Sequence, residues 1–293
     1  MLPNGWLILD KPLHLSSTQA SNRIRRHFKL EKLGHIGTLD PLASGVLILA
    51  IGEATKLIPY LPIKPKTYEF EICWGEARET DDAEGKVTHT SSYYPTPDEI
   101  KDSICGFLGE INQIPPIYSA IKKNGQPAYK LARKGQTPFL TGRKIFIYDL
   151  KLTSMVNERI SRFEVKCSSG TYVRSLARDL ALSLQTYGYI YSLRRTQDSF
   201  FHIQDTFPLE KILEISHNSK EYPFIKTLEA VLDDIPAVSL TENEAQRIRQ
   251  GLSIDSVCFQ HLSPIALFFN GRLLAMAISK EGRVFPQRVF NLV

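Results

Sequence analysis

The strongest constraint on the fold is the apolar run of residues 46–51, "VLILAI", whose β-rich composition predicts a strand buried on both faces. A second pattern follows at residues 66–74, where "KTYEFEICW" alternates apolar with polar side chains. That alternation has the period of a strand with one buried face. The two patterns predict two strands, one before and one after the chain that connects them.

The other periodic segments mix helices with strands. Three helices are predicted: "SSTQASNRIRRHF" capped by Ser16 or Ser17, "TPDEIKDSICGFLG" capped by Thr96, and "TYVRSLARDLALSL". Further strands are predicted at "WLILD", "RKIFIYDLKL" and "RFEVKCSS". Because the two types do not alternate strictly, the predicted fold class is mixed α/β, of the α+β kind.

The length of 293 residues exceeds the usual size of one domain, so two are expected. We predict a first domain at 1–225 and a small β-rich domain at 230–293. The second contains a helix capped by Thr241 in "TENEAQRIRQG" and a hairpin, "IALFFNGRLLAMAI", that turns at Asn270 and Gly271.

The net charge of +5 is modest but unevenly distributed. Residues 111–148 contain no Asp or Glu, and their basic side chains are Lys122, Lys123, Lys130, Arg133, Lys134, Arg143 and Lys144. A second basic run comprises Arg23, Arg25, Arg26, His27 and Lys29. Two such segments favour a polyanionic partner, nucleic acid first, although solvated helix faces would give the same pattern.

Composition excludes several classes of protein. With 43% hydrophobic and 23% charged residues and no apolar stretch of bilayer length, no membrane association is predicted. The N-terminus lacks a secretion signal, so a cytoplasmic location is expected. The four cysteines are scattered, which argues against zinc and disulfides and predicts buried thiols. No phosphate-cradling loop is present, so neither a metal nor a cofactor is expected.

One carboxylate, Asp40, lies within the stretch "KLGHIGTLDPLASGVLILAIG". Pro41 pushes its backbone toward an extended conformation, and Gly34, Gly37 and Gly45 allow tight turns. Taken alone, Asp40 is either a residue that caps its own turn or a carboxylate held rigidly for nucleophilic chemistry.

The segment "GHIGTLDPLASGVL" closely resembles the signature of the TruB family of tRNA pseudouridine synthases. "LDKP", "KTYEF", "QIPPIYSAIKKNGQPAYKLARKG", "CSSGTYVRSLARDL" and "LRRTQDSFF" resemble further family blocks in family order. The resemblance implies a pseudouridine-synthase-like catalytic domain with a largely antiparallel sheet, followed by a small PUA-like RNA-binding domain. It also implies isomerisation of uridine to pseudouridine at position 55, in the T-loop of tRNA, after the base is flipped out.

The same resemblance assigns roles to individual residues. Asp40 becomes the nucleophile, Arg174 the cation that keeps it ionised, and Tyr68 the tyrosine that stacks on the base. His35 is expected to hold the rearranged RNA. Tyr172 and Leu193 match positions that line the uracil pocket, and residues 111–148 read as an RNA-gripping insertion. The implied partner is the T-arm of tRNA, with no obligate protein partner, and attack at ribose C1′ or at uracil C6 both stay open.

Two positions depart from the family pattern. His14 stands where the family usually has glycine, and Arg78, Glu79 and Thr80 replace a Thr-Asp-Thr sequence. The acidic cluster that follows does not have EF-hand spacing and is interpreted as a solvated hairpin turn; its members are Glu76, Glu79, Asp81, Asp82 and Glu84.

Three rival functions are less consistent with the sequence. A synthase guided to another RNA is disfavoured by the lack of long basic extensions. A tRNA-binding protein with a relic pocket is disfavoured by the intact set Asp40, Tyr68 and Arg174. A glycosidase would need a second carboxylate near Asp40, which the motif does not supply.

Overall fold

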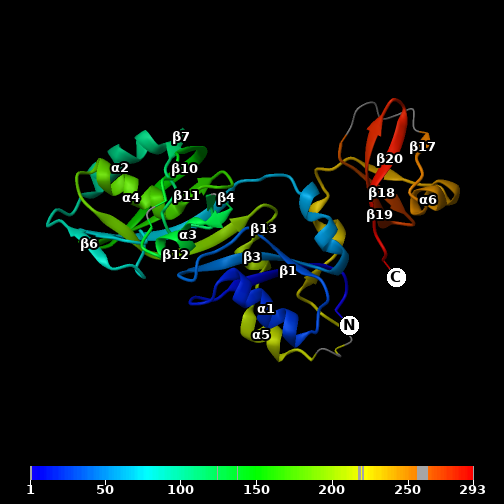
Figure 1. Ribbon diagram of the computed structural model, residues 1–293, viewed down its shortest axis with the longest axis horizontal. Coiled ribbons are helices and arrows are strands. Elements are labelled where there is room, and N and C mark those ends of the chain that lie inside the picture. The colour runs from blue at the N-terminus through cyan, green and yellow to red at the C-terminus, as the bar shows by residue number, and fades with distance from the viewer. Residues whose placement is uncertain are drawn as a thin grey trace.

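The computed structural model describes residues 2–123, 125–136, 138–216, 219, 221–255 and 263–292. Within these ranges an eleven-stranded sheet and a five-stranded sheet dominate the fold (Figure 1). The large sheet has the order β14-β1-β3-β12-β4-β11-β10-β7, with β2, β13 and β15 paired to β3, β12 and β1. Its strands are β1 Gly5–Lys11, β2 Leu33–Ile36, β3 Ala43–Ile51, β4 Lys66–Trp74, β7 Gly109–Gln113, β10 Arg143–Asn157, β11 Ile160–Cys167, β12 Gly188–Asp198, β13 Phe201–His202, β14 Phe207–Pro208 and β15 Ile225–Lys226.

Most neighbouring strands in the large sheet are antiparallel, and only β1/β14 and β3/β12 are parallel among the described pairs. The predicted mixed α/β class with a largely antiparallel sheet is therefore confirmed. The five strands predicted in this region are β1, β3, β4, β10 and β11. The central strand β12 was not predicted, although it joins the two halves by pairing with both β3 and β4.

The helices begin where their caps predict. Ser16 and Thr96 each accept a hydrogen bond from the backbone N–H three residues later, and both ends form capping boxes. The α-helices are α1 Ser17–His27, α2 Pro97–Ile104, α3 Ala128–Ala132, α4 Val173–Ser183, α5 Leu209–Glu214 and α6 Glu242–Arg249. Short 3₁₀ turns are η1 Gly52–Lys56, η2 Ile58–Tyr60, η3 Cys105–Phe107, η4 Ile203–Asp205 and η5 Leu228–Val231.

Two apolar clusters cover opposite faces of β1 and β3. One contains Leu47 and extends across the sheet to Phe70 and to Leu176 of α4. The other contains Ile48 and Phe290, so it joins the large sheet to the C-terminal segment. Because side chains along a strand alternate between faces, β3 is buried on both sides, as its apolar run predicted.

The C-terminal sheet has the order β16-β18-β19-β20-β17 and lies with α6 at one end of the molecule (Figure 1). Asn270 and Gly271 have φ values of 50° and 74°, which confirms the predicted hairpin turn. The strands are β16 Ala237–Ser239, β17 Ile254–Asp255, β18 Ile265–Phe269, β19 Arg272–Lys280 and β20 Arg283–Val289. The C-terminal segment is tied to η1, because Asn291 N–H donates to Glu53 Oε2 at 2.9 Å.

Two small ribbons complete the described elements: β5 Glu76–Arg78 with β6 Val87–Thr90, and β8 Lys122–Lys123 with β9 Gln126–Pro127. No helix in the described ranges is both long and apolar enough to cross a lipid bilayer.

The cysteines only partly match the prediction that all are buried. Cys73 and Cys167 are buried, whereas Cys105 is exposed, so the prediction was wrong there. Cys105 follows the last residue of α2, whose buried side is made by Ile100 and Ile104. The next position along the chain therefore faces outward. Cys258 lies outside the described residues.

Candidate active site

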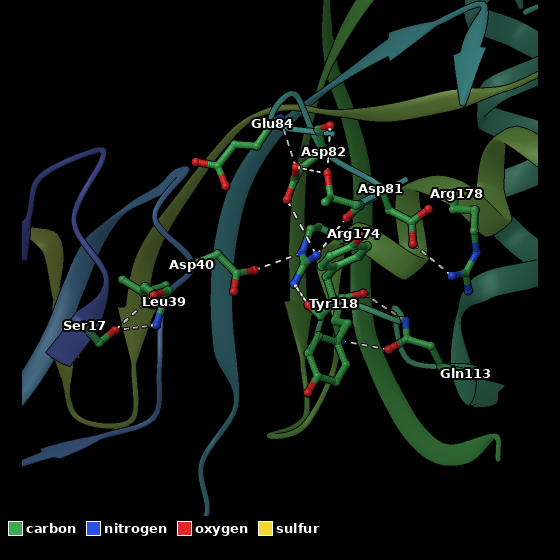
Figure 2. A network of polar contacts seen from close by, with 12 residues as sticks. Ser17, Leu39, Asp40, Asp81, Asp82, Glu84, Gln113, Tyr118, Arg174 and Arg178 are labelled. Atoms are coloured by element: carbon green, nitrogen blue, oxygen red, sulfur yellow. Dashed lines mark hydrogen bonds and ion pairs between the residues drawn. The ribbon is translucent and has the colours of Figure 1, made fainter. Parts of the chain in front are cut away.

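The loop that carries Asp40 is fixed on both sides, and Figure 2 shows the side at Ser17 and Leu39. Ser17, at the start of α1, accepts a hydrogen bond from Leu39 N–H at 2.7 Å and donates to Leu39 O at 3.1 Å. His14 N–H donates to Pro41 O at 2.8 Å. His14 has a φ of 64°, so this turn keeps a backbone geometry that glycine adopts readily. The loop is held on the residues immediately before and after the carboxylate.

Arg174 connects Asp40 to two other segments (Figure 2). Its Nε lies 2.9 Å from Asp40 Oδ2 and its Nη1 lies 3.6 Å from Asp82 Oδ2. Nη1 also donates to Thr80 O at 2.7 Å, and Nη2 donates to Tyr118 O at 2.9 Å. The Arg174 side chain is 4% exposed and that of Asp40 is 41% exposed. The cation is therefore locked in place while the carboxylate stays accessible to a substrate.

The acidic hairpin is only partly the solvated turn that the sequence suggested, because Glu79 and Glu84 are exposed but Asp82 is not. Asp82 is buried, accepts hydrogen bonds from Glu84 N–H at 3.1 Å and from the Thr80 hydroxyl, and faces Arg174. Its backbone forms an isolated bridge with Ile190, so the turn is packed against β12. For Asp82 the prediction was wrong, because the hairpin folds back over the sheet and brings together segments that are distant in the chain. Among the described residues no cluster of His, Cys, Asp or Glu could hold a metal ion.

Asp81 pairs with Arg178 of α4 at 3.0 Å. Burial raises the pKa of Asp81 to about 6, against the opposing effect of Arg178. A second ion pair thus joins the hairpin to the helix that carries Arg174.

A cavity of about 240 Å³ opens beside Asp40. Five of the residues predicted for the site line it: Asp40, Tyr68, Tyr172, Arg174 and Leu193. His35 does not line this cavity; it lies on β2 opposite Leu49 of β3, and burial lowers its pKa. The structure thus brings together residues from four segments spread over about 150 positions.

Tyr68 and Tyr172 are held by their surroundings. The ring of Tyr68 belongs to the apolar core, and burial raises its pKa to about 12, with Arg195 opposing the shift. The phenol is therefore protonated near neutral pH. The backbone of Tyr172 exchanges two hydrogen bonds with the amide of Gln113, at 2.8 and 3.1 Å, and the guanidinium of Arg143 lies 4.7 Å from its ring centroid.

Three charged residues at the cavity were not among those that the sequence singled out as site residues: Lys66, Arg143 and Arg195. Lys66 opens "KTYEF" and Arg195 belongs to "LRRTQD". A charged residue within a strand was the available signal, but nothing local indicates whether such a side chain faces water or a cavity.

Comparisons with known proteins identify the family of this chain. Residues 25–173 match the family described as "TruB family pseudouridylate synthase (N terminal domain)". The chain is 43% identical to "tRNA pseudouridine synthase B" of Rhodospirillum rubrum, over 99% of this chain and 97% of that protein. It is 41% identical to the protein of the same name from Caulobacter sp. strain K31, over 99% and 96%.

Solved structures with the same fold include "Structure of H/ACA RNP bound to a substrate RNA containing 2'-deoxyuridine", with a TM-score of 0.73 and 21% identity. That match covers 98% of this chain and 85% of the other. "Crystal Structure of a Cbf5-Nop10-Gar1 Complex" gives 0.72 and 22%, covering 98% and 84%. At these identities the likeness supports the fold alone. The family match and the near full-length relatives carry more: this chain belongs to the TruB family of pseudouridylate synthases, which are isomerases.

Proposed function

We propose that this protein converts uridine to pseudouridine at position 55 in the T-loop of tRNA, with Asp40 as the nucleophile. The observation that carries the proposal is the accessible Asp40 carboxylate, paired with the buried Arg174 at a cavity that also contains Tyr68. Relatives named tRNA pseudouridine synthase B span nearly the whole chain, which supports tRNA as the substrate. The T-loop position rests on the resemblance of the Asp40 segment to the family signature.

The chemistry needs a group that keeps hold of the nucleoside while the base turns. The bond from ribose C1′ to uracil N1 breaks, a bond from C1′ to C5 forms, the C5 proton leaves and N1 gains a proton. A carboxylate can hold the sugar or the base covalently during the exchange. The ion pair with Arg174 would orient the Asp40 carboxylate for such an attack.

The remaining cavity residues suit a flipped base. Flipping costs roughly a few kcal/mol, and stacking on an aromatic ring returns about 1–3 kcal/mol per base. Tyr68 would stack on the uracil, and Tyr172 and Leu193 line the same cavity. His35 is proposed to contact the RNA outside this cavity.

The basic insertion at 111–148 supports an RNA partner. Lys122, Lys130, Arg133 and Lys134 are exposed, and within the described part of the chain none of them forms an ion pair with a carboxylate. Unpaired exposed cations are available to phosphates. The first domain, 1–225, would perform the chemistry.

The C-terminal residues 230–293 would act as a PUA-like RNA-binding domain. There the guanidinium of Arg249 lies 5.1 Å from the ring centroid of Phe269, beside a cavity of about 570 Å³. An exposed cation next to an aromatic ring is suited to RNA. A tRNA substrate also fits the expected cytoplasmic location.

The test uses the purified protein alone with an unmodified tRNA transcript, and pseudouridine is mapped at nucleotide resolution. We expect modification at position 55 only, and none in a transcript with cytidine there. Asp40→Asn should abolish turnover while tRNA binding is retained, and Asp149→Asn, a surface carboxylate paired with Lys151, serves as the matched control. Turnover by Asp40→Asn would contradict the nucleophile, and modification elsewhere would contradict the T-loop position.

A further inference from the structure

A second charged cluster lies at the same cavity, separate from Arg174. Lys66 Nζ is 2.9 Å from Asp198 Oδ2, and Arg195 Nη1 is 3.2 Å from the same oxygen. Lys66 and Arg195 both line the cavity, and the side chains of Arg195 and Asp198 are 1% exposed. Two cations share one carboxylate, so the cluster has an excess of one positive charge.

The cluster retains hydrogen-bond donors that no described residue uses. Arg195 Nε donates to Val46 O at 2.8 Å, and the guanidinium also interacts with the Tyr68 phenol, but its buried Nη2 makes no hydrogen bond of normal geometry among the described residues. Lys66 has three N–H donors, and Asp198 is its one hydrogen-bond acceptor in the described ranges. An unsatisfied buried donor costs about 1–3 kcal/mol, so such groups call for an explanation.

Backbone geometry brings the Asp40 loop onto this cluster. Gly37 has a φ of 66°, and a Cβ at that position would lie 2.9 Å from Lys66 Nζ. Any side chain there would crowd the ammonium group. The loop that presents Asp40 therefore passes directly over the excess positive charge.

The proposed reaction produces a negative charge that such a cluster could stabilise. When the bond from C1′ to N1 breaks, its electron pair stays on uracil, and the resulting anion is delocalised over N1, O2 and O4. The charge disappears when C5 bonds to C1′, the C5 proton leaves and N1 is protonated. Arg174 forms ion pairs with two carboxylates and donates hydrogen bonds to two backbone carbonyls; only its Nε, which faces Asp40 at 2.9 Å, makes no hydrogen bond among the described residues.

We propose that Lys66 is a catalytic residue that donates a hydrogen bond to a carbonyl oxygen of the detached uracil, and that Arg195 is a positioning residue that offsets the charge of Asp198. This role rests on the proposed function of the site. Preorganised donors aimed at developing charge act strongly in a site with little water. Burial lowers the pKa of Lys66, and the hydrogen bond to Asp198 opposes that shift.

The first experiment measures single-turnover rates with enzyme in excess over an unmodified tRNA transcript. Lys66→Met should slow pseudouridine formation by about 10²–10³-fold, the loss typical of removing one such donor, with tRNA affinity unchanged. Lys66→Arg should restore most of the rate because it keeps the charge and a donor. Lys226→Met is the matched control, since Lys226 pairs with Asp205 at the same 2.9 Å outside the cavity.

The second experiment separates catalysis from a structural role. A transcript with 5-fluorouridine at the target carries an electron-withdrawing group that stabilises the uracil anion by itself. The deficit of Lys66→Met in scission of the bond from C1′ to N1 should therefore be smaller on this transcript than on the uridine transcript. An equal deficit on both, or a normal rate with uridine, would overturn the role of Lys66. Failure of the proposed function would differ, because the unaltered protein would then form no pseudouridine.

Discussion

Replacing Arg174 with Met should destabilise the fold mainly through Asp82 and only slightly through Asp40. Met keeps the apolar stem but removes the guanidinium, leaving the buried Asp82 carboxylate without its cation. It also leaves the carbonyls of Thr80 and Tyr118 without their donor. Breaking a buried ion pair costs about 3–5 kcal/mol, so we expect the free energy of unfolding to fall by that amount.

Asp82 and Asp40 should respond differently to the loss of Arg174 because their exposed fractions differ. Asp82 is 4% exposed, so water cannot replace the lost cation, whereas Asp40 is 41% exposed and regains hydration. An ion pair at an exposed group contributes about 0–1 kcal/mol. The double variant Arg174→Met/Asp82→Asn should therefore lose about 0.5–3 kcal/mol less unfolding free energy than the sum of the two single losses. For the double variant Arg174→Met/Asp40→Asn, the corresponding difference in unfolding free energy should be less than about 1 kcal/mol.

Urea unfolding measures these differences, followed by tryptophan fluorescence, to which both Trp6 and Trp74 contribute, and by circular dichroism. Trp74 is buried on β4 and its indole donates to Ser161 Oγ at 2.7 Å, so it reports on the half of the sheet near Arg174. Two outcomes would refute the reasoning: a loss below about 1 kcal/mol in Arg174→Met, or equal differences for the two double variants.

Three further predictions concern the backbone, pH and salt. Gly45→Ala should cost about 2–5 kcal/mol, because its φ is 102° and a Cβ would collide with the backbone of β12; Gly106→Ala, with open space around it, should be near neutral in the same urea titration. Burial lowers the pKa of Lys11 from 10.5 to about 8, so the unfolded chain binds more protons between these pH values and stability should rise with pH there; a comparable rise in Lys11→Met would exclude this group as its source. Changing Lys130 and Arg133 to Gln should weaken tRNA binding. The slope of the logarithm of the binding constant against the logarithm of the salt concentration should become shallower by about 1 for each phosphate that is no longer neutralised. An unchanged slope would show that the two residues lie outside the RNA interface.

Elements with local signals could be predicted from the sequence. Ser16, Thr96 and Thr241 cap helices through hydrogen bonds to N–H groups three residues away, so each signal and its effect lie within one turn. The turn at Asn270 and Gly271 is equally local, because it depends on two residues that tolerate positive φ. The Asp40 segment could be singled out from its glycines and Pro41, and the role proposed for Asp40 comes from the family resemblance.

Strand β12 shows where local reasoning fails. Its sequence, "GYIYSLRRTQD", places Arg195 and Asp198 at buried positions, so it lacks the apolar alternation that indicates a strand. The two charges are tolerated because Arg195 and Asp198 pair with each other, and Asp198 also pairs with Lys66 of β4. That partnership exists only once the sheet has formed.

The sequence by itself indicated the longer helices and the turn at Asn270 and Gly271, and it singled out Asp40 as a candidate site residue. The tertiary structure alone decided the environment of the charges. Arg174 meets Thr80 across 94 positions and Tyr118 across 56, and Asp198 meets Lys66 across 132. Local conformation is selected by neighbours within a few residues, whereas burial and pairing of a charge depend on which distant segments the fold brings around it.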